Sequence, residues 1–144
     1  MVDESLLKEL KVAQDAGASA AKPEDMLKVF GFIKEISTEN EDLKEELEDM
    51  DIAIQMAITD ADKKYWLSVK EGLLDFGEGD VENPSFTMSS TLEVGAGILM
   101  GEVDATSAYM AGDITVEGNL QDAMAFQEII ELALEAYEDL IEDL

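Results

Sequence analysis

The chain has 144 residues, 47% of them hydrophobic, and this length predicts one domain that buries about two-thirds of its unfolded surface. The formal net charge is -26, and no Lys or Arg follows Lys70. Phosphate groups are bound through cationic side chains, so this charge argues against nucleic acids and anionic membrane surfaces as partners. It is typical of a well-solvated surface; adaptation to a salty cytoplasm is the alternative explanation.

Cys and His are both absent, which excludes disulfides, thiol chemistry, Ser–His and Cys–His catalytic pairs and the usual zinc sites. No Gly-rich phosphate loop with a Lys is present, and nothing singles out a catalytic or metal-binding pair among the many carboxylates. We therefore expect no enzyme activity, catalytic residue, metal or cofactor. No apolar run is long enough to cross a membrane, and the first residues do not resemble a signal peptide, so the cytoplasm is the expected location.

The first fifty residues show helical periodicity. Helices are expected over residues 3–15 and from Pro23 to about Ile36, separated by a linker rich in small residues. This linker divides the chain into an N-terminal extension, residues 1–22, and a domain, residues 23–144. Thr38 and Glu41 match a capping box that opens a third, acidic helix.

After residue 51 the hydrophobic period changes to two, which indicates strands. We expect them at 52–58, 63–70, 73–76 and 86–88, joined by short turns into an antiparallel meander. Trp66 should then lie on the open face of the sheet. A large aromatic side chain there needs cover, which could come from Leu6, Leu7 and Leu10 of the first helix or from a second subunit.

Residues 89–120 combine several helix and strand boundaries. A capping box at Ser90 predicts a helix that ends before Gly101, and Asp104 predicts a second short helix that ends at Gly112. A fifth strand is expected at 113–117, followed by a long helix capped by Asn119.

These elements define an α+β fold, a five-stranded antiparallel sheet with helices packed on one face. Its inward-facing side chains should be Ile54, Met56, Leu67, Val69, Leu74, Phe76, Phe86, Met88, Ile114 and Val116.

Three features predict an apolar pocket between this sheet and its helices. The helix before Gly101 contains Gly95 and Gly97, which destabilise a helix and indicate either close packing or a mobile flap. The apolar arc of the last helix is wider than one sheet face requires. Flexible Met side chains are frequent around both segments. An ordinary core filled by these side chains is the alternative interpretation.

One motif resembles the C-terminal signature of the sterol carrier protein-like domains. It reads Gly101-x-x-x-Ala105-x-x-Ala108-x-Met110-x-Gly112, followed by Ile114-x-Val116-x-Gly118-Asn119-Leu120. The resemblance covers about residues 24–134. It implies a five-stranded sheet covered by helices, with a hydrophobic tunnel that binds and transfers sterols, fatty acids, acyl-CoAs or phospholipids without catalysis.

The expected function is therefore non-enzymatic binding, and transfer, of a lipid or fatty acid by a monomer or homodimer that does not insert stably into membranes. The alternative is a structural or dimerisation module with a filled core, accessory to a separate enzyme. An anionic head group would find only Lys63, Lys64, Lys70 and backbone amides as partners. The residues expected to line the tunnel are Phe76, Met88, Leu92, Ile98, Leu99, Met100, Tyr109, Met110, Phe126, Ile130 and Leu134.

Overall fold

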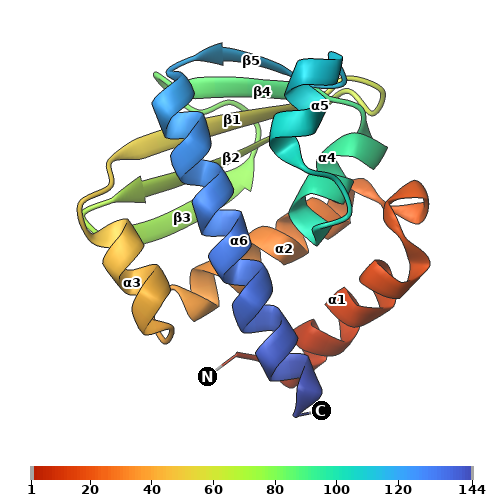
Figure 1. Ribbon diagram of the computed structural model, residues 1–144, viewed down its shortest axis with the longest axis vertical. Helices are drawn as coiled ribbons and strands as arrows, with labels where there is room; N and C mark the ends of the chain where they lie inside the picture. Colours follow the sequence, from red (N-terminus) through yellow and green to blue (C-terminus); the bar gives the residue numbers. More distant parts are fainter. Residues whose placement is uncertain (1, 144) are drawn as a thin grey trace.

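A computed structural model describes residues 2–143, which form a five-stranded sheet covered by helices (Figure 1). Figure 1 shows helix α6 running across one face of the sheet, with α4 and α5 beside it on one side and α3 on the other. The helices are α1 (Glu4–Ala16), the short 3-10 helix η1 (Ala18–Ala20), α2 (Pro23–Ile36), α3 (Glu41–Glu48), α4 (Leu92–Met100), α5 (Ala105–Ala111) and α6 (Leu120–Glu142). The strands are β1 (Ile52–Ile58), β2 (Lys63–Lys70), β3 (Leu73–Glu78), β4 (Phe86–Ser90) and β5 (Thr115–Gly118). The predicted α+β class, with helices on one face, is confirmed.

The sheet is mixed, which corrects the predicted antiparallel meander. The strand order is β3-β2-β1-β4-β5, and β1 and β4 run parallel, with Ile54 opposite Phe86. The other three pairs are antiparallel. The reason is that residues 79–85 do not form a hairpin turn but pass β2 and β1, so that β4 pairs with the free edge of β1.

Gln55 holds this crossing segment against the sheet. It alternates with the inward-facing Ile54 and Met56, so its side chain lies on the outer face, where it is nevertheless only 6% exposed. Its amide nitrogen donates to the carbonyl oxygens of Tyr65 (3.0 Å) and Gly79 (2.9 Å), and its oxygen accepts from the backbone N–H of Val81 (2.8 Å). A buried amide with three such bonds fixes the path of the crossover.

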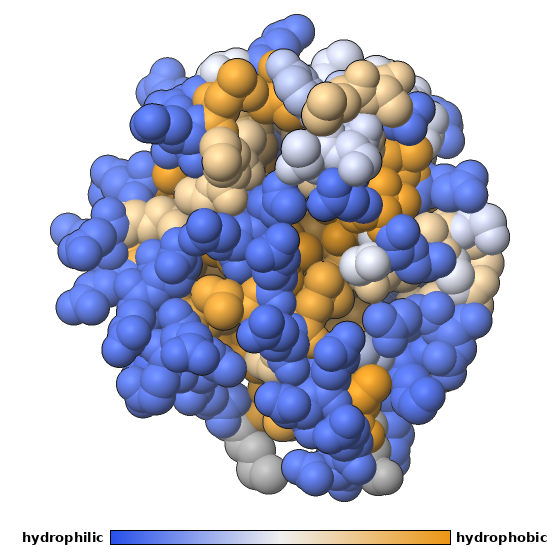
Figure 2. All heavy atoms as spheres, in the orientation of Figure 1, coloured by the Kyte–Doolittle hydropathy of each residue, from blue (hydrophilic) through white to orange (hydrophobic). Residues whose placement is uncertain are grey.

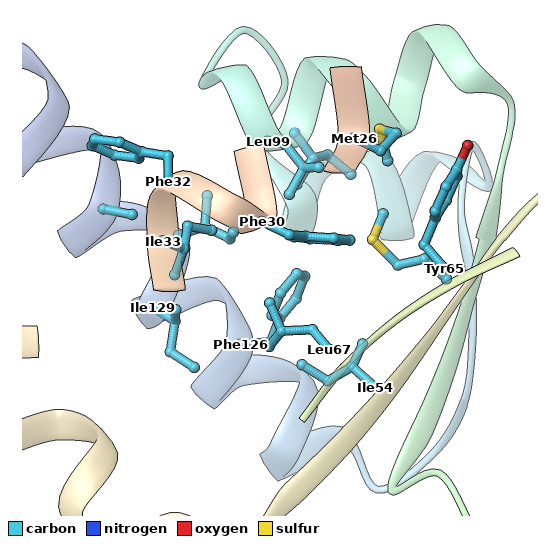
Figure 3. Packing of buried hydrophobic residues seen from close by; sticks show 14 of the residues in the cluster. Met26, Phe30, Phe32, Ile33, Ile54, Tyr65, Leu67, Leu99, Phe126 and Ile129 are labelled. Carbon is cyan, nitrogen blue, oxygen red and sulfur yellow. The ribbon is translucent and has the colours of Figure 1, made fainter. Parts of the chain in front are cut away.

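The core lies between the sheet and helices α2 and α6 (Figure 3). Figure 3 shows Phe30 of α2 and Phe126 of α6 pointing toward Ile54 and Leu67 of the sheet. The predicted inward-facing residues all belong to or pack against this core, although two of them, Phe76 and Val116, are only partly buried.

The helix caps are partly as predicted. Asp104 and Asn119 cap α5 and α6, each accepting hydrogen bonds from backbone N–H groups of the first turn. Helices α3 and α4 begin later than predicted. Asn40, not Thr38, caps α3, and Thr91, not Ser90, caps α4. Local Ser and Thr patterns predict a helix start within about two residues, since neighbouring side chains compete for the same N–H groups.

Helix α1 does not cover Trp66. Its buried residues Leu7 and Leu10 join the main core, and the helix packs on α2 and α6. The Trp66 indole instead lies over Gly77 of the neighbouring strand, at a place where an added Cβ would be 2.8 Å from the ring. Gly77 thus leaves space for the indole ring of Trp66, which is partly buried although α1 does not cover it. The division at residue 22 stays a prediction.

Two carboxyl groups meet where α3 packs on α6. A side-chain hydrogen bond with Glu128 raises the pKa of Glu46 above its usual 4.5, and desolvation and the charge of Glu128 act in the same direction. The folded protein therefore holds the proton of Glu46 more tightly than the unfolded chain does. This contribution to stability is complete below pH 4.5 and is lost as the pH rises through the raised pKa of Glu46, above which its carboxylate is repelled by the charge of Glu128.

We expect Glu128→Gln to raise the melting temperature at pH 7 by about 1–2 °C, a small effect because the pair is near the surface. At pH 4 the gain should disappear. Thermal unfolding at both pH values measures this, and Glu45→Gln, an exposed position on the same helix as Glu46, controls for the loss of one negative charge anywhere. Equal gains in the two variants would mean that only the overall charge matters.

Candidate functional site

A cavity of about 590 Å³ lies between the β4–β5 end of the sheet, the α4–α5 segment and the N-terminal half of α6. Its deep wall is apolar and consists of side chains that are at most 5% exposed: Met88, Ile98, Ile114, Phe126 and Ile130, together with Phe86. A volume of this size is typical of small-molecule binding sites. The apolar wall would favour a hydrocarbon ligand, because burial of such a ligand removes apolar surface from water.

The cavity opens to solvent next to α5 and the start of α6, and we call this opening its mouth. Tyr109, Leu120 and Met124 line it and are 45%, 51% and 69% exposed. Figure 2 shows apolar side chains at the surface beside the N-terminal half of α6, on a face that is otherwise largely hydrophilic. Exposed apolar side chains around an apolar cavity mark a place where a ligand can enter or be covered.

Close packing around α4 shapes one side of the cavity. A Cβ added at Gly97 would lie 2.6 Å from Val103 Cγ2 and 3.6 Å from Ala18 Cβ, so the glycine lets the next loop and η1 approach the helix. Val103 is itself part of the lining. Of the two interpretations of the helix glycines, the structure favours close packing.

The turn after α4 is held by hydrogen bonds that also place acidic groups at the cavity mouth. Glu102 accepts a hydrogen bond from the backbone N–H of Ala18 (2.8 Å). Asp104 accepts hydrogen bonds from the N–H and hydroxyl of Ser107, and these bonds lower the pKa of Asp104. Across the mouth, the hydroxyl of Thr106 donates to Gln127 Oε1 (3.2 Å), which links α5 to α6.

The structure brings together six of the residues predicted to line the site. These are Met88, Ile98, Tyr109, Phe126, Ile130 and Leu134.

A second cavity, of only about 40 Å³, lies beyond Ile130 and Leu134, which line both spaces. The predicted residues Leu99 and Met100 line this smaller space, together with Leu10 of α1. It is too small for a lipid, so a ligand could reach these two residues only if the shared wall moved.

Three predicted residues lie outside both cavities. Phe76 packs on Phe30, with ring centroids 6.3 Å apart. Leu92 begins α4, where its N–H donates to Asp60, and Met110 is 80% exposed on α5. Met110 lies next to the lining residue Tyr109 in the sequence, but a step of one residue turns a side chain about 100° around a helix.

Polar residues of the mouth were not among the sequence predictions. They are Glu102, Asp104, Thr106, Gln127 and Glu131. The only sequence signal for them was the position of Asp104 as a helix cap, because acidic residues are so frequent in this chain that no single one stands out.

Comparison with protein-family models gives a match over residues 33–131, to the model described as the SCP-2 sterol transfer family. The chain belongs to this family. The predicted resemblance is thereby confirmed, and the matched segment contains every strand and every residue of the large cavity except Leu134. A search among curated proteins found no match.

Solved structures share the fold. The sterol carrier protein domain 2 of Helicoverpa armigera has a TM-score of 0.62 and 20% identity, with 80% of this chain and 94% of that chain covered. Palmitated SCP2L2 from Aedes aegypti has a TM-score of 0.55 and 19% identity, with 71% and 90% covered. The inverting sec-alkylsulfatase Pisa1 from Pseudomonas sp. has a TM-score of 0.54 and 17% identity, with 62% of this chain covered. The chain spans only 14% of the length of that sulfatase.

At these identities the structural likeness establishes the SCP2 fold. Within residues 2–143, no helix combines the length and the apolar character needed to cross a bilayer.

Proposed function

We propose that this SCP2 protein binds, and passes on, an apolar chain-like or ring-like molecule such as a fatty acid, a sterol-like compound or another lipid. The observation that carries the proposal is the cavity of about 590 Å³ with its buried apolar wall. Membership of a family described by sterol transfer supports it, and the palmitated mosquito domain is a protein of the same fold that is described with a fatty acyl group.

The proposal includes no catalytic step. The sequence has no His or Cys, and the buried part of the cavity wall is hydrocarbon. Catalysis on a bound lipid would need a nucleophile or a general base beside the reacting bond. The charged groups of the lining lie instead at the solvent-exposed mouth.

The test is native mass spectrometry of the protein purified without detergent, with an organic extract analysed in parallel. We expect a lipid in near-stoichiometric amount, and the same spectrum gives the oligomeric state. Protein recovered empty is then tested with N-phenylnaphthylamine, a neutral apolar dye that fluoresces on leaving water. A protein that is empty and also fails to bind the dye would leave the structural or dimerisation module as the better description.

A further inference from the structure

The ends of the cavity differ in charge as well as in polarity. The deep wall is uncharged, whereas Glu102, Asp104 and Glu131 line the mouth. All three are exposed, so they would lie near the polar end of a lipid whose tail fills the apolar part. They do not form a metal site, since no group of three acidic side chains within residues 2–143 is placed to hold a metal ion.

Within residues 2–143, no Lys or Arg side chain lines the cavity beside these three acidic side chains, which we call the rim. Every lining residue falls between Phe86 and Leu134, and the chain contains no Lys or Arg after Lys70. The lysines lie on α1, α2, α3 and β2 or just before α2, elements that contribute nothing to the lining. Five of them already have acidic partners: Lys11, Lys28, Lys34, Lys63 and Lys64.

The hydrogen-bonding groups of the rim also favour neutral or positively charged head groups over anionic ones. A carboxylate only accepts hydrogen bonds, so it suits a hydroxyl or ammonium group and has nothing to donate to another carboxylate or to a phosphate. Thr106 already donates its hydroxyl to Gln127, and the amide of Gln127 is 3.3 Å from a carboxylate oxygen of Glu131. The donors that remain for a head group, the Tyr109 hydroxyl and the second N–H of the Gln127 amide, are uncharged. An anionic head group would therefore meet repulsion from three carboxylates with no cation to offset it.

From these observations we propose that the cavity discriminates by head-group charge. It accepts lipids whose polar end is a neutral hydroxyl or a positively charged amine, and it rejects carboxylates and phosphate esters of the same chain length. The inference rests on the proposed function and narrows its ligands: sterol-like alcohols and other neutral or amine-bearing lipids stay, whereas free fatty acids, which are carboxylates at neutral pH, are excluded.

The experiment compares dodecanol, kept below its solubility limit, with dodecylamine and dodecanoic acid, each kept below its critical micelle concentration, as competitors of N-phenylnaphthylamine at pH 7.5. The tails are equal, so differences in affinity report the head group. We expect the acid to bind about tenfold more weakly than the alcohol, and the amine to bind at least as well as the alcohol. Because the rim is exposed, 1 M salt, which shortens the Debye length to about 3 Å, should remove most of the difference.

Glu131→Lys should selectively restore binding of the acid, by about tenfold, and weaken binding of the amine. Glu138→Lys is the matched control: it makes the same charge change at an exposed position of the same helix, about 10 Å further along its axis and outside the lining. The control should leave the order of affinities unchanged. An effect equal in both variants would mean that net charge, and not the rim, decides.

The two proposals fail in different ways. If the dye binds and the acid competes as well as the alcohol does, the head-group inference is wrong and the carrier function stands. If neither the dye nor any of the three compounds binds, both are wrong.

Discussion

Replacing Ala123 by Trp should abolish uptake of apolar ligands while leaving the fold intact. Ala123 is a partly buried residue of α6 and lines the cavity of about 590 Å³. An indole at this position would occupy the space that we assign to the ligand, and it would not need to displace a packed neighbour. We expect the affinity for N-phenylnaphthylamine to fall by more than about tenfold, with a change in melting temperature of only a few degrees.

Met110→Trp is the control for this experiment. Met110 is 80% exposed and lies outside the lining, so a Trp there adds the same aromatic bulk near the mouth without filling the cavity. Dye binding should remain close to that of the unchanged protein. If Ala123→Trp still bound the dye, the ligand would have to bind elsewhere. A large loss of stability in that variant would mean that the cavity is too small for an indole.

Gly118→Ala should destabilise the protein by about 3 kcal/mol or more, which lowers the melting temperature by about 10 °C. Gly118 has φ +117°, a conformation that residues with a Cβ rarely adopt. An added Cβ would also lie 2.5 Å from the carbonyl oxygen of Ser85 and 2.9 Å from Cα of Phe86. Both are backbone atoms, so β5 would have to move away from β4 and would open one wall of the cavity.

A second glycine separates the effect of the positive φ angle from the effect of the close contact with neighbouring backbone atoms. Gly112 has φ +82°, but an added Cβ there would meet no atom within 4 Å. Gly112→Ala should cost only the strain of the left-handed conformation, about 1–2 kcal/mol. Thermal or urea unfolding of both variants gives the comparison. Equal losses of stability would show that conformation alone matters at Gly118 and that the close contact with β4 does not.

The sequence was sufficient for the elements whose signals are local. Alternation predicted β1 and β2 with their observed bounds, and a glycine in the left-handed conformation ends α4 and α5 as expected. The strand bounds were less accurate where the pattern was short: β3 and β4 extend two residues further than predicted, and β5 covers 115–118 instead of 113–117. A strand of four residues has too few positions for its period to fix its ends.

The parallel pairing of β1 with β4 had no local signal. The crossing segment that allows it is held by Gln55, whose hydrogen bonds join residues far apart in the sequence. The site shows the same limit. Helical and strand patterns place apolar side chains on the correct elements, but which of them border a cavity depends on the spacing between α5 and α6. Both Met110 and Leu134 were therefore predicted to line the site, although Leu134 does line the cavity and Met110 is exposed outside it.

The central position of β1 has a consequence for how the chain folds during synthesis. Strands β1 to β3 form a local unit with short turns, whereas the second neighbour of β1 is β4, which the ribosome releases later. Until then β1 has an unpaired edge and its Ile and Met side chains lack part of their cover, a state that promotes association between nascent chains. Because acidic residues greatly outnumber lysines, such intermediates repel one another, and we expect this repulsion to oppose their association before the native sheet is complete.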